Sequence, residues 1–209
     1  MVRPLRILCL PGWRTSSAAM RAQLVFSSFE KNLKGEVTFL PIDPALPASG
    51  PPQSIVQMLD STGPYFQWWY TQHGDNPVYE GIEESVQYVI DTLQKQGPID
   101  GLLGFSQGAA MVHYLTALQA TGDPHLKGMF QFAILVSGFL PQDSRYETML
   151  PTSRVLNLPS LHVYGKEDEL YSHCCRAATF YNNPVIIDHS RGHSFPKLGK
   201  YDTRNQREN

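Results

Sequence analysis

The sequence has few cysteines and no long run of apolar residues. Its three cysteines are an odd number, and Cys174 and Cys175 are neighbours in the chain, which the geometry of a disulfide makes hard to bridge. No stretch reaches the roughly 18 apolar residues that a membrane-spanning helix needs. The apolar run from Leu5 to Leu10 is also shorter than the core of a signal peptide. These absences predict a cytoplasmic protein without a membrane span, in a reducing compartment.

The sequence also lacks an excess of charge of either sign, and it lacks the motifs that bind common cofactors. It has 17 Lys and Arg against 19 Asp and Glu, with no basic cluster denser than residues 3–6, which argues against a nucleic-acid partner. No glycine-rich dinucleotide fingerprint follows the first apolar run, and no residues have metal-ligand spacing. We therefore expect no cofactor, no metal and a small, largely apolar molecule as partner. The oligomeric state stays open, with a homodimer as one option.

The composition is that of one ordinary globular domain over residues 1–209, with 42% hydrophobic and 17% charged residues. Apolar segments alternate with segments of helical period. The expected strands are residues 5–10, 36–42, 99–105, 132–136, 160–164 and 184–188, and the expected helices are residues 16–33, 79–95, 107–119 and 172–180. Such alternation predicts an α/β fold with a mostly parallel sheet and helices on both faces. The polar residues from about 200 to 209 are expected to form a disordered tail.

Residues 43–78 interrupt the alternation and are called the aromatic insert below. Their first ten residues are rich in proline, which predicts an extended loop. The rest contains Trp68, Trp69 and other aromatic residues without a clear strand or helix period. We expect this segment to be irregular. Trp68 and Trp69, together with Phe139, are candidates to line an acyl pocket, although such rings fill a protein core equally well.

A Gly-x-Ser-x-Gly pattern at residues 104–108 predicts a nucleophile. An apolar strand lies directly before it and an Ala-rich and Leu-rich helix directly after it, as in the strained turn that exposes a catalytic serine. A Cβ atom on Gly104 or Gly108 would collide with the neighbouring strand or helix. Ser106 is therefore the candidate nucleophile, and the backbone N–H of Gln107 is a candidate donor to the oxyanion.

A serine nucleophile needs an imidazole to take its proton and a carboxylate to orient the imidazole, and in this type of fold the acid precedes the histidine in the chain. Asp168 is the preferred acid, because it lies in the loop that follows the expected strand 160–164. His193 is the preferred base, because it follows Gly192 in the loop after the strand 184–188. The alternatives that spacing leaves open are Glu167 and Glu169 for the acid and His189 for the base.

Seven motifs in order resemble the FSH family of serine hydrolases, compact α/β-hydrolases that include fungal thioesterases acting beside polyketide synthases. They are residues 8–14, 68–70, 79–85, 97–110, 135–139, 158–165 and 192–193. The resemblance implies the same roles for Ser106, Asp168 and His193. It also implies that the backbone N–H of Trp13 is the second oxyanion donor.

The sequence departs from this family at two positions beside the site. Pro11 stands where the family usually has a histidine, and Arg191 stands where it often has the first glycine of a Gly-Gly-His motif. The resemblance predicts a serine carboxylesterase that cleaves esters of apolar acyl chains through an acyl-enzyme. The alternatives are an acyl-thioesterase acting on carrier-protein or coenzyme A thioesters, and a non-catalytic binding protein on a hydrolase scaffold.

Overall fold

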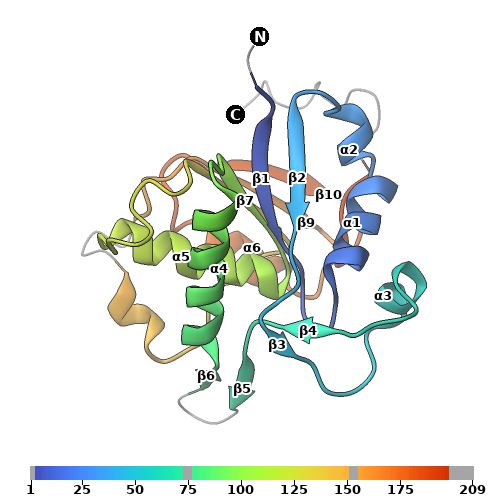
Figure 1. The fold of residues 1–209 in the computed structure, drawn as a ribbon, viewed down its shortest axis with the longest axis horizontal. Coiled ribbons are helices and arrows are strands. Elements are labelled where there is room, and N and C mark those ends of the chain that lie inside the picture. The colour runs from blue at the N-terminus through green and yellow to red at the C-terminus, as the bar shows by residue number, and fades with distance from the viewer. Residues whose placement is uncertain (1–2, 73–76, 151–154, 198–209) are drawn as a thin grey trace.

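A computed structural model describes residues 3–72, 77–150 and 155–197 and contains the predicted parallel sheet (Figure 1). Its six strands lie in the order β10-β9-β8-β7-β1-β2, and every neighbouring pair is parallel. The strands are β1 (Leu5–Leu10), β2 (Val37–Pro41), β7 (Gly101–Phe105), β8 (Phe132–Val136), β9 (Ser160–Gly165) and β10 (Val185–His189). Because the strands are parallel, their carboxyl ends meet at one edge of the sheet, where such folds bind ligands.

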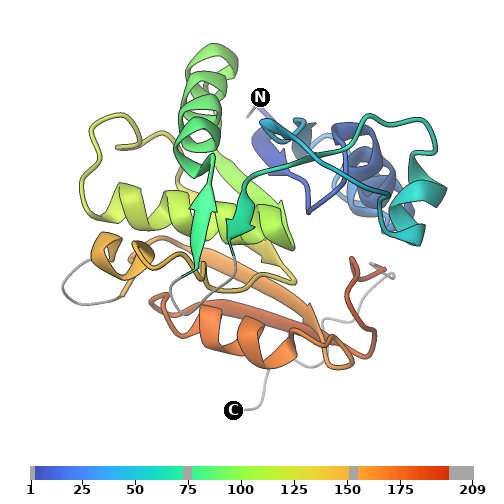
Figure 2. The ribbon, with the colours of Figure 1, turned by 90° about the horizontal axis from the view of Figure 1, so that it is seen from below.

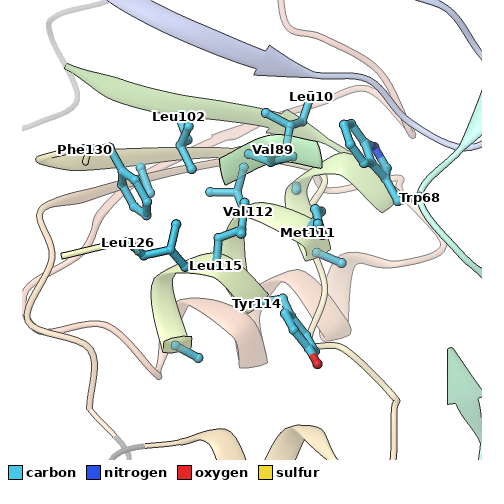
Figure 3. Close-up of a cluster of buried hydrophobic side chains, with 14 of the residues drawn as sticks. Leu10, Trp68, Val89, Leu102, Met111, Val112, Tyr114, Leu115, Leu126 and Phe130 are labelled. Carbon is cyan, nitrogen blue, oxygen red and sulfur yellow. The ribbon is translucent and has the colours of Figure 1, made fainter. Parts of the chain in front are cut away.

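Helices cover both faces of the sheet, because side chains along each strand point alternately to opposite faces. On β1, Leu8 and Leu10 belong to a cluster with residues of α4 (Ile82–Gln96) and α5 (Gln107–Ala120), part of which is shown in Figure 3. Ile7 and Cys9 point the other way and pack with residues of α1 (Ser17–Phe26). The predicted layered α/β architecture is confirmed.

The segment expected to be one helix over residues 16–33 is two helices. Ser16 caps α1 as its position suggested, because its hydroxyl accepts a hydrogen bond from the amide of Ala19 at 3.0 Å. The helix stops at Phe26, and α2 (Phe29–Asn32) follows. Between them Ser28 has a φ of 65°, a left-handed conformation that no helix interior contains.

The aromatic insert is more regular than expected. The strands β3 (Leu46–Pro47) and β4 (Phe66–Gln67) form one antiparallel pair, and β5 (Tyr70–Gln72) and β6 (Val78–Glu80) form another. The helix α3 (Ser54–Leu59) lies between β3 and β4 in the chain and packs on α1 (Figure 1). The prediction of an irregular segment was wrong because elements of two to six residues are too short to show a period.

The remaining elements are α6 (Tyr171–Ala178) and a short 3₁₀ helix at Tyr146–Met149, and Figure 2 shows the layers from below. The predicted helix 79–95 begins only at Ile82, because Tyr79 lies in β6. The predicted tail from about residue 200 lies outside the described residues. Among the described helices, none is long and apolar enough to cross a membrane.

Candidate active site

Ser106 lies in a strained turn between β7 and α5. Its φ of 54° and ψ of −118° are sparsely populated by residues other than glycine, and such strain persists only where the surroundings enforce it. The amide of Ser106 donates to Val136 on β8 at 3.0 Å, and its carbonyl accepts from the amides of Ala109 and Ala110 at 2.9 and 3.1 Å. The neighbouring strand and the first turn of α5 therefore hold the serine in this conformation.

Both glycines of the pattern are required by backbone contacts. A Cβ on Gly104 would lie 2.3 Å from the carbonyl oxygen of Gly108, and one on Gly108 would lie 2.0 Å from the carbonyl oxygen of Leu10. Neither distance can be relieved by turning a side chain, because the opposing atoms belong to the backbone. The expected close approach of strand and helix around Ser106 is thus present.

The loop after β1 passes beside the serine. A Cβ on Gly12 would lie 3.3 Å from the Cβ of Ser106, so the following residue, Trp13, begins within reach of the site. The carbonyl of Pro11 accepts a 2.8 Å hydrogen bond from the indole N–H of Trp68. Pro11 lacks only an N–H, so its replacement of the usual histidine leaves this contact intact.

The backbone amides of Trp13 and Gln107 have no protein acceptor in the described part of the chain. Gln107 begins α5, where the first N–H groups have no partner within the helix. Its side chain is instead tied to the aromatic insert, since its amide oxygen accepts from the Trp68 backbone at 3.1 Å and its nitrogen donates to the Trp69 carbonyl at 3.2 Å. Both predicted oxyanion donors are therefore free to bind a ligand.

Asp168 and His193 form a hydrogen-bonded pair at the carboxyl ends of β9 and β10. The side chain of Asp168 is fully buried, and its Oδ2 lies 2.9 Å from Nδ1 of His193, whose side chain is 22% exposed. The other carboxylate oxygen accepts from the amide of Leu170 at 2.9 Å. Glu167 and Glu169 are exposed to solvent. Of the three acidic residues that spacing left open, only Asp168 meets a histidine in the described structure.

His193 and Ser106 line the same cavity. The imidazole also packs against Phe105, with ring centroids 5.1 Å apart. With Nδ1 directed at Asp168, Nε2 is the ring nitrogen left for the serine. No hydrogen bond joins the Ser106 hydroxyl to His193 among the described residues, and such bonds often tighten only when substrate binds.

His189, the alternative base, forms a hydrogen bond within its own loop. Its Nδ1 accepts from the amide of Arg191 at 3.2 Å. Burial, and next the nearby charge of Arg191, lower the pKa of His189, which favours a neutral acceptor. The geometry therefore indicates that His189 stabilises the loop around Arg191.

Two cavities meet at Ser106. The first has a volume of about 370 Å³ and is mainly apolar, and the second has a volume of about 500 Å³. Trp69 and Phe139, predicted as pocket residues, line the second cavity. Trp68 lines neither, because it is 0% exposed within the core. For Trp68 the structure fits the alternative of a ring that fills the core, which depends on packing that its sequence neighbours do not reveal.

Sequence reasoning missed the walls of the first cavity. They come partly from the end of α1 and from α3, with Phe26, Ile55 and Met58 among them. Met58 is 81% exposed, which is an unusual position for so large an apolar side chain. The only available signal was the apolar spacing within residues 54–59. Arg191 lies at this cavity, as its departure from the family pattern suggested.

The loop that carries His193 packs closely against Gly165. Gly192, which precedes His193 and which the choice of His193 was based on, makes no contact of this kind. The amides of Lys166 and Glu167 donate to the carbonyls of His189 and Arg191 at 2.7 and 3.2 Å. A Cβ on Gly165 would lie only 1.8 Å from the carbonyl oxygen of Arg191, whereas one on Gly192 would meet nothing closer than 3.4 Å. Gly192 also has no left-handed φ.

We therefore expect Gly165→Ala to lower the free energy of unfolding by about 2–3 kcal/mol, or roughly 5–10 °C in Tm, because the loop must shift. Displacing His193 by about 1 Å should also lower kcat by roughly 10²-fold. The matched variant Gly192→Ala should keep its Tm within about 2 °C. Calorimetry on both variants checks the stabilities, and equal Tm values would contradict this account of the loop contact.

The chain is similar to known enzymes over nearly its whole length. A family model described as serine hydrolase (FSH1) matches residues 1–204. Human Esterase OVCA2 is 34% identical over 93% of this chain and 90% of its own length. Esterase C25G4.2 of Caenorhabditis elegans is 34% identical over 94% and 89%, respectively.

Solved structures resemble the fold at lower sequence identity. Acyl-protein thioesterase 2 of Zea mays has a TM-score of 0.62 at 20% identity, covering 92% of this chain and 87% of that one. Esterase PE8 has a TM-score of 0.61 at 16% identity, with coverage of 92% and 86%. At these identities the likeness shows the fold alone, and it confirms the predicted α/β-hydrolase fold.

Proposed function

Because this chain belongs to the serine hydrolase (FSH1) family, whose relatives are esterases, we propose that it hydrolyses esters of apolar acyl chains at Ser106. The observation that carries the proposal is the hydrogen bond from His193 to the buried Asp168, beside a cavity that also reaches the strained serine. A nucleophile, a base and a group that orients the base are the parts such catalysis requires.

In this proposal the hydroxyl of Ser106 attacks the carbonyl carbon while Nε2 of His193 takes its proton. Asp168 keeps the proton of the neutral imidazole on Nδ1 and stabilises the imidazolium that forms. The amides of Trp13 and Gln107 donate to the oxyanion, and the rigid turn places the Gln107 amide in advance of the reaction. His193 then protonates the leaving oxygen. Water hydrolyses the acyl-enzyme by the same steps in reverse.

The first cavity is the proposed site for the acyl chain. Its lining includes Val56 and Leu59 of α3, Phe26 of α1, and Phe105 and Phe195 next to His193. Each methylene buried there stabilises binding by about 0.8 kcal/mol, or roughly a fourfold change in kcat/KM for a chain that fits. The wild-type enzyme should therefore favour longer acyl chains until the cavity is full.

Replacing Leu59 with tryptophan should shift this preference toward short chains, because the indole takes space in the cavity. We expect the ratio of kcat/KM for p-nitrophenyl decanoate over p-nitrophenyl butyrate to fall by roughly tenfold, which corresponds to about two methylenes of lost contact. Rates for a series of acyl lengths measure the ratio. The proposal for the first cavity fails if the wild-type ratio persists.

The matched control is Gln57→Trp, which adds the same ring to an exposed position on α3 that lines neither cavity. It should keep the wild-type chain-length profile. A shift of equal size in both variants would show that the ring acts by disturbing α3.

Thioesters of the same acyl chains are the alternative substrates, because the same residues would cleave them. The polar lining of the second cavity next to Ser106 suits a polar leaving group, whether this is an alcohol or a thiol. Parallel assays of octanoyl esters and octanoyl thioesters separate the two preferences.

A further inference from the structure

The second cavity has a different chemical character from the first. Both are lined by Ser106 and Trp13. The surface of the first is mainly apolar, although Arg191 and Lys197 are among its lining residues. Polar side chains make up more of the second, among them those of Gln67, Thr71 and Gln142. Arg14 is the only charged residue among its described lining residues. A substrate that reaches from one cavity to the other across Ser106 is therefore apolar on one side of the scissile bond and polar on the other.

Arg14 is held at this cavity by an unusual local structure. Its φ is 51°, so its backbone is strained in the way common at ligand sites. The guanidinium carbon lies 4.0 Å from the centroid of the Trp13 ring, in a cation–π contact. Gly50 provides space on another side, since a Cβ there would lie 3.1 Å from Nη2 of Arg14. These contacts position the guanidinium without neutralising it.

The hydrogen-bonding capacity of Arg14 is almost unused. Among the described residues its side chain donates one hydrogen bond, from Nη1 to the carbonyl of Pro51 at 3.3 Å. Its Nε is buried and has no hydrogen-bond partner within the described ranges. In the described part of the chain, no carboxylate forms an ion pair with it. An arginine fork with free donors matches the planar oxygens of a carboxylate or a phosphate.

We infer that the second cavity is a leaving-group subsite in which Arg14 binds an anionic group of the substrate. The inference rests on the proposed function, because it takes the first cavity for the acyl chain and so leaves the second for the alcohol or thiol. The preferred substrates are then apolar acyl esters or thioesters whose leaving group carries a carboxylate or a phosphate.

Hydrolysis of such a substrate needs no reactant other than water. Ser106 displaces the anionic alcohol or thiol, which leaves with the proton that His193 took from the serine. Water then adds to the acyl-enzyme, giving up one proton to Ser106 through His193, and the fatty acid departs. Arg14 takes no part in these proton transfers. It contributes only to the binding of the leaving group in the Michaelis complex and the transition state.

Three octanoyl esters test the inference, with 4-hydroxybenzoate, 4-hydroxyphenyl phosphate or neutral 4-hydroxybenzamide as leaving group. Arg14→Gln should lower the ratio of kcat/KM for the better anionic ester over the amide ester by about tenfold. The ratio within one variant is independent of the fraction of folded enzyme. Arg14→Lys keeps the positive charge but loses the planar fork of donors, so its ratio should lie between those of the wild type and Arg14→Gln. The anionic ester that depends more on Arg14 identifies carboxylate or phosphate as the preferred group.

The control is Arg176→Gln, which removes one positive charge at an exposed site on α6 that lines neither cavity. It should leave the ratio unchanged. The inference is overturned if Arg14→Gln has the wild-type ratio, or if Arg176→Gln lowers it equally. Failure of the wild-type enzyme to hydrolyse any of the three esters would instead refute the proposed function. Hydrolysis of the anionic esters by Arg14→Gln as efficiently as by the wild type would refute this inference alone.

Discussion

Replacing Ser106 with alanine should lower kcat for a p-nitrophenyl acyl ester by roughly 10⁴-fold or more, because no other described group can form the acyl-enzyme at this position. The side chain of Ser106 makes no hydrogen bond that holds the fold among the described residues. We therefore expect the thermal stability of the variant to stay close to that of the wild type. Steady-state kinetics and calorimetry measure the two effects separately.

A fluorophosphonate probe gives a second readout that does not depend on the choice of ester. Wild-type protein should be labelled and Ser106→Ala should not, because the probe reacts with an activated serine. Ser28→Ala is a matched control, since Ser28 also has a left-handed φ, 65°, but lies between α1 and α2 outside both cavities. Undiminished hydrolysis by Ser106→Ala would refute the nucleophile, and an unlabelled wild type would favour a non-catalytic binding protein.

Replacing Asp168 with asparagine should lower kcat by roughly 10³–10⁴-fold, although the two side chains have nearly the same shape. The amide oxygen can still accept from the amide of Leu170, as the carboxylate does at 2.9 Å. The amide nitrogen would then donate to Nδ1 of His193, which lies 2.9 Å from the present carboxylate oxygen. This holds the imidazole in the tautomer that carries its proton on Nε2, so it can no longer take the serine proton.

The neighbouring acidic residues provide the comparison. Glu167→Gln and Glu169→Gln each remove a charge from an exposed side chain, and each should keep kcat within about twofold, since exposed charges interact weakly through solvent. A large loss in either variant, together with a small loss in Asp168→Asn, would reassign the acid. Retained Tm in Asp168→Asn is needed to attribute its loss to chemistry.

Much of this site was predictable because its patterns are local. The glycines at 104 and 108 lie within five residues of chain, between an apolar strand and a helix, and each avoids a backbone collision that only glycine permits. The positions of the strands could also be predicted, since a buried parallel strand is a short apolar run between polar turns. These features depend on neighbours in sequence, so the sequence alone contains the information.

Other features depended on residues distant in the chain. Spacing left three acidic residues as candidates, and burial beside His193 separates Asp168 from its exposed neighbours. The need for glycine at 165 arises from the Arg191 carbonyl on a different loop. The break at Ser28 within an apparently continuous helical pattern reflects packing of α1 and α2 on the sheet, which overrides weak helix propensity.

The sequence by itself determined that the chain is an α/β protein with a serine on a strained turn. Few other structures are compatible with alternating strand and helix patterns and a serine flanked by glycines. Only the tertiary structure decided which surfaces meet at that serine. It brings α1 and α3 together as an apolar wall of the first cavity. It also leaves Arg14, which lines the second cavity, without a carboxylate partner in the described chain. Cavities form between segments far apart in sequence, so no local pattern records their shape or their charge.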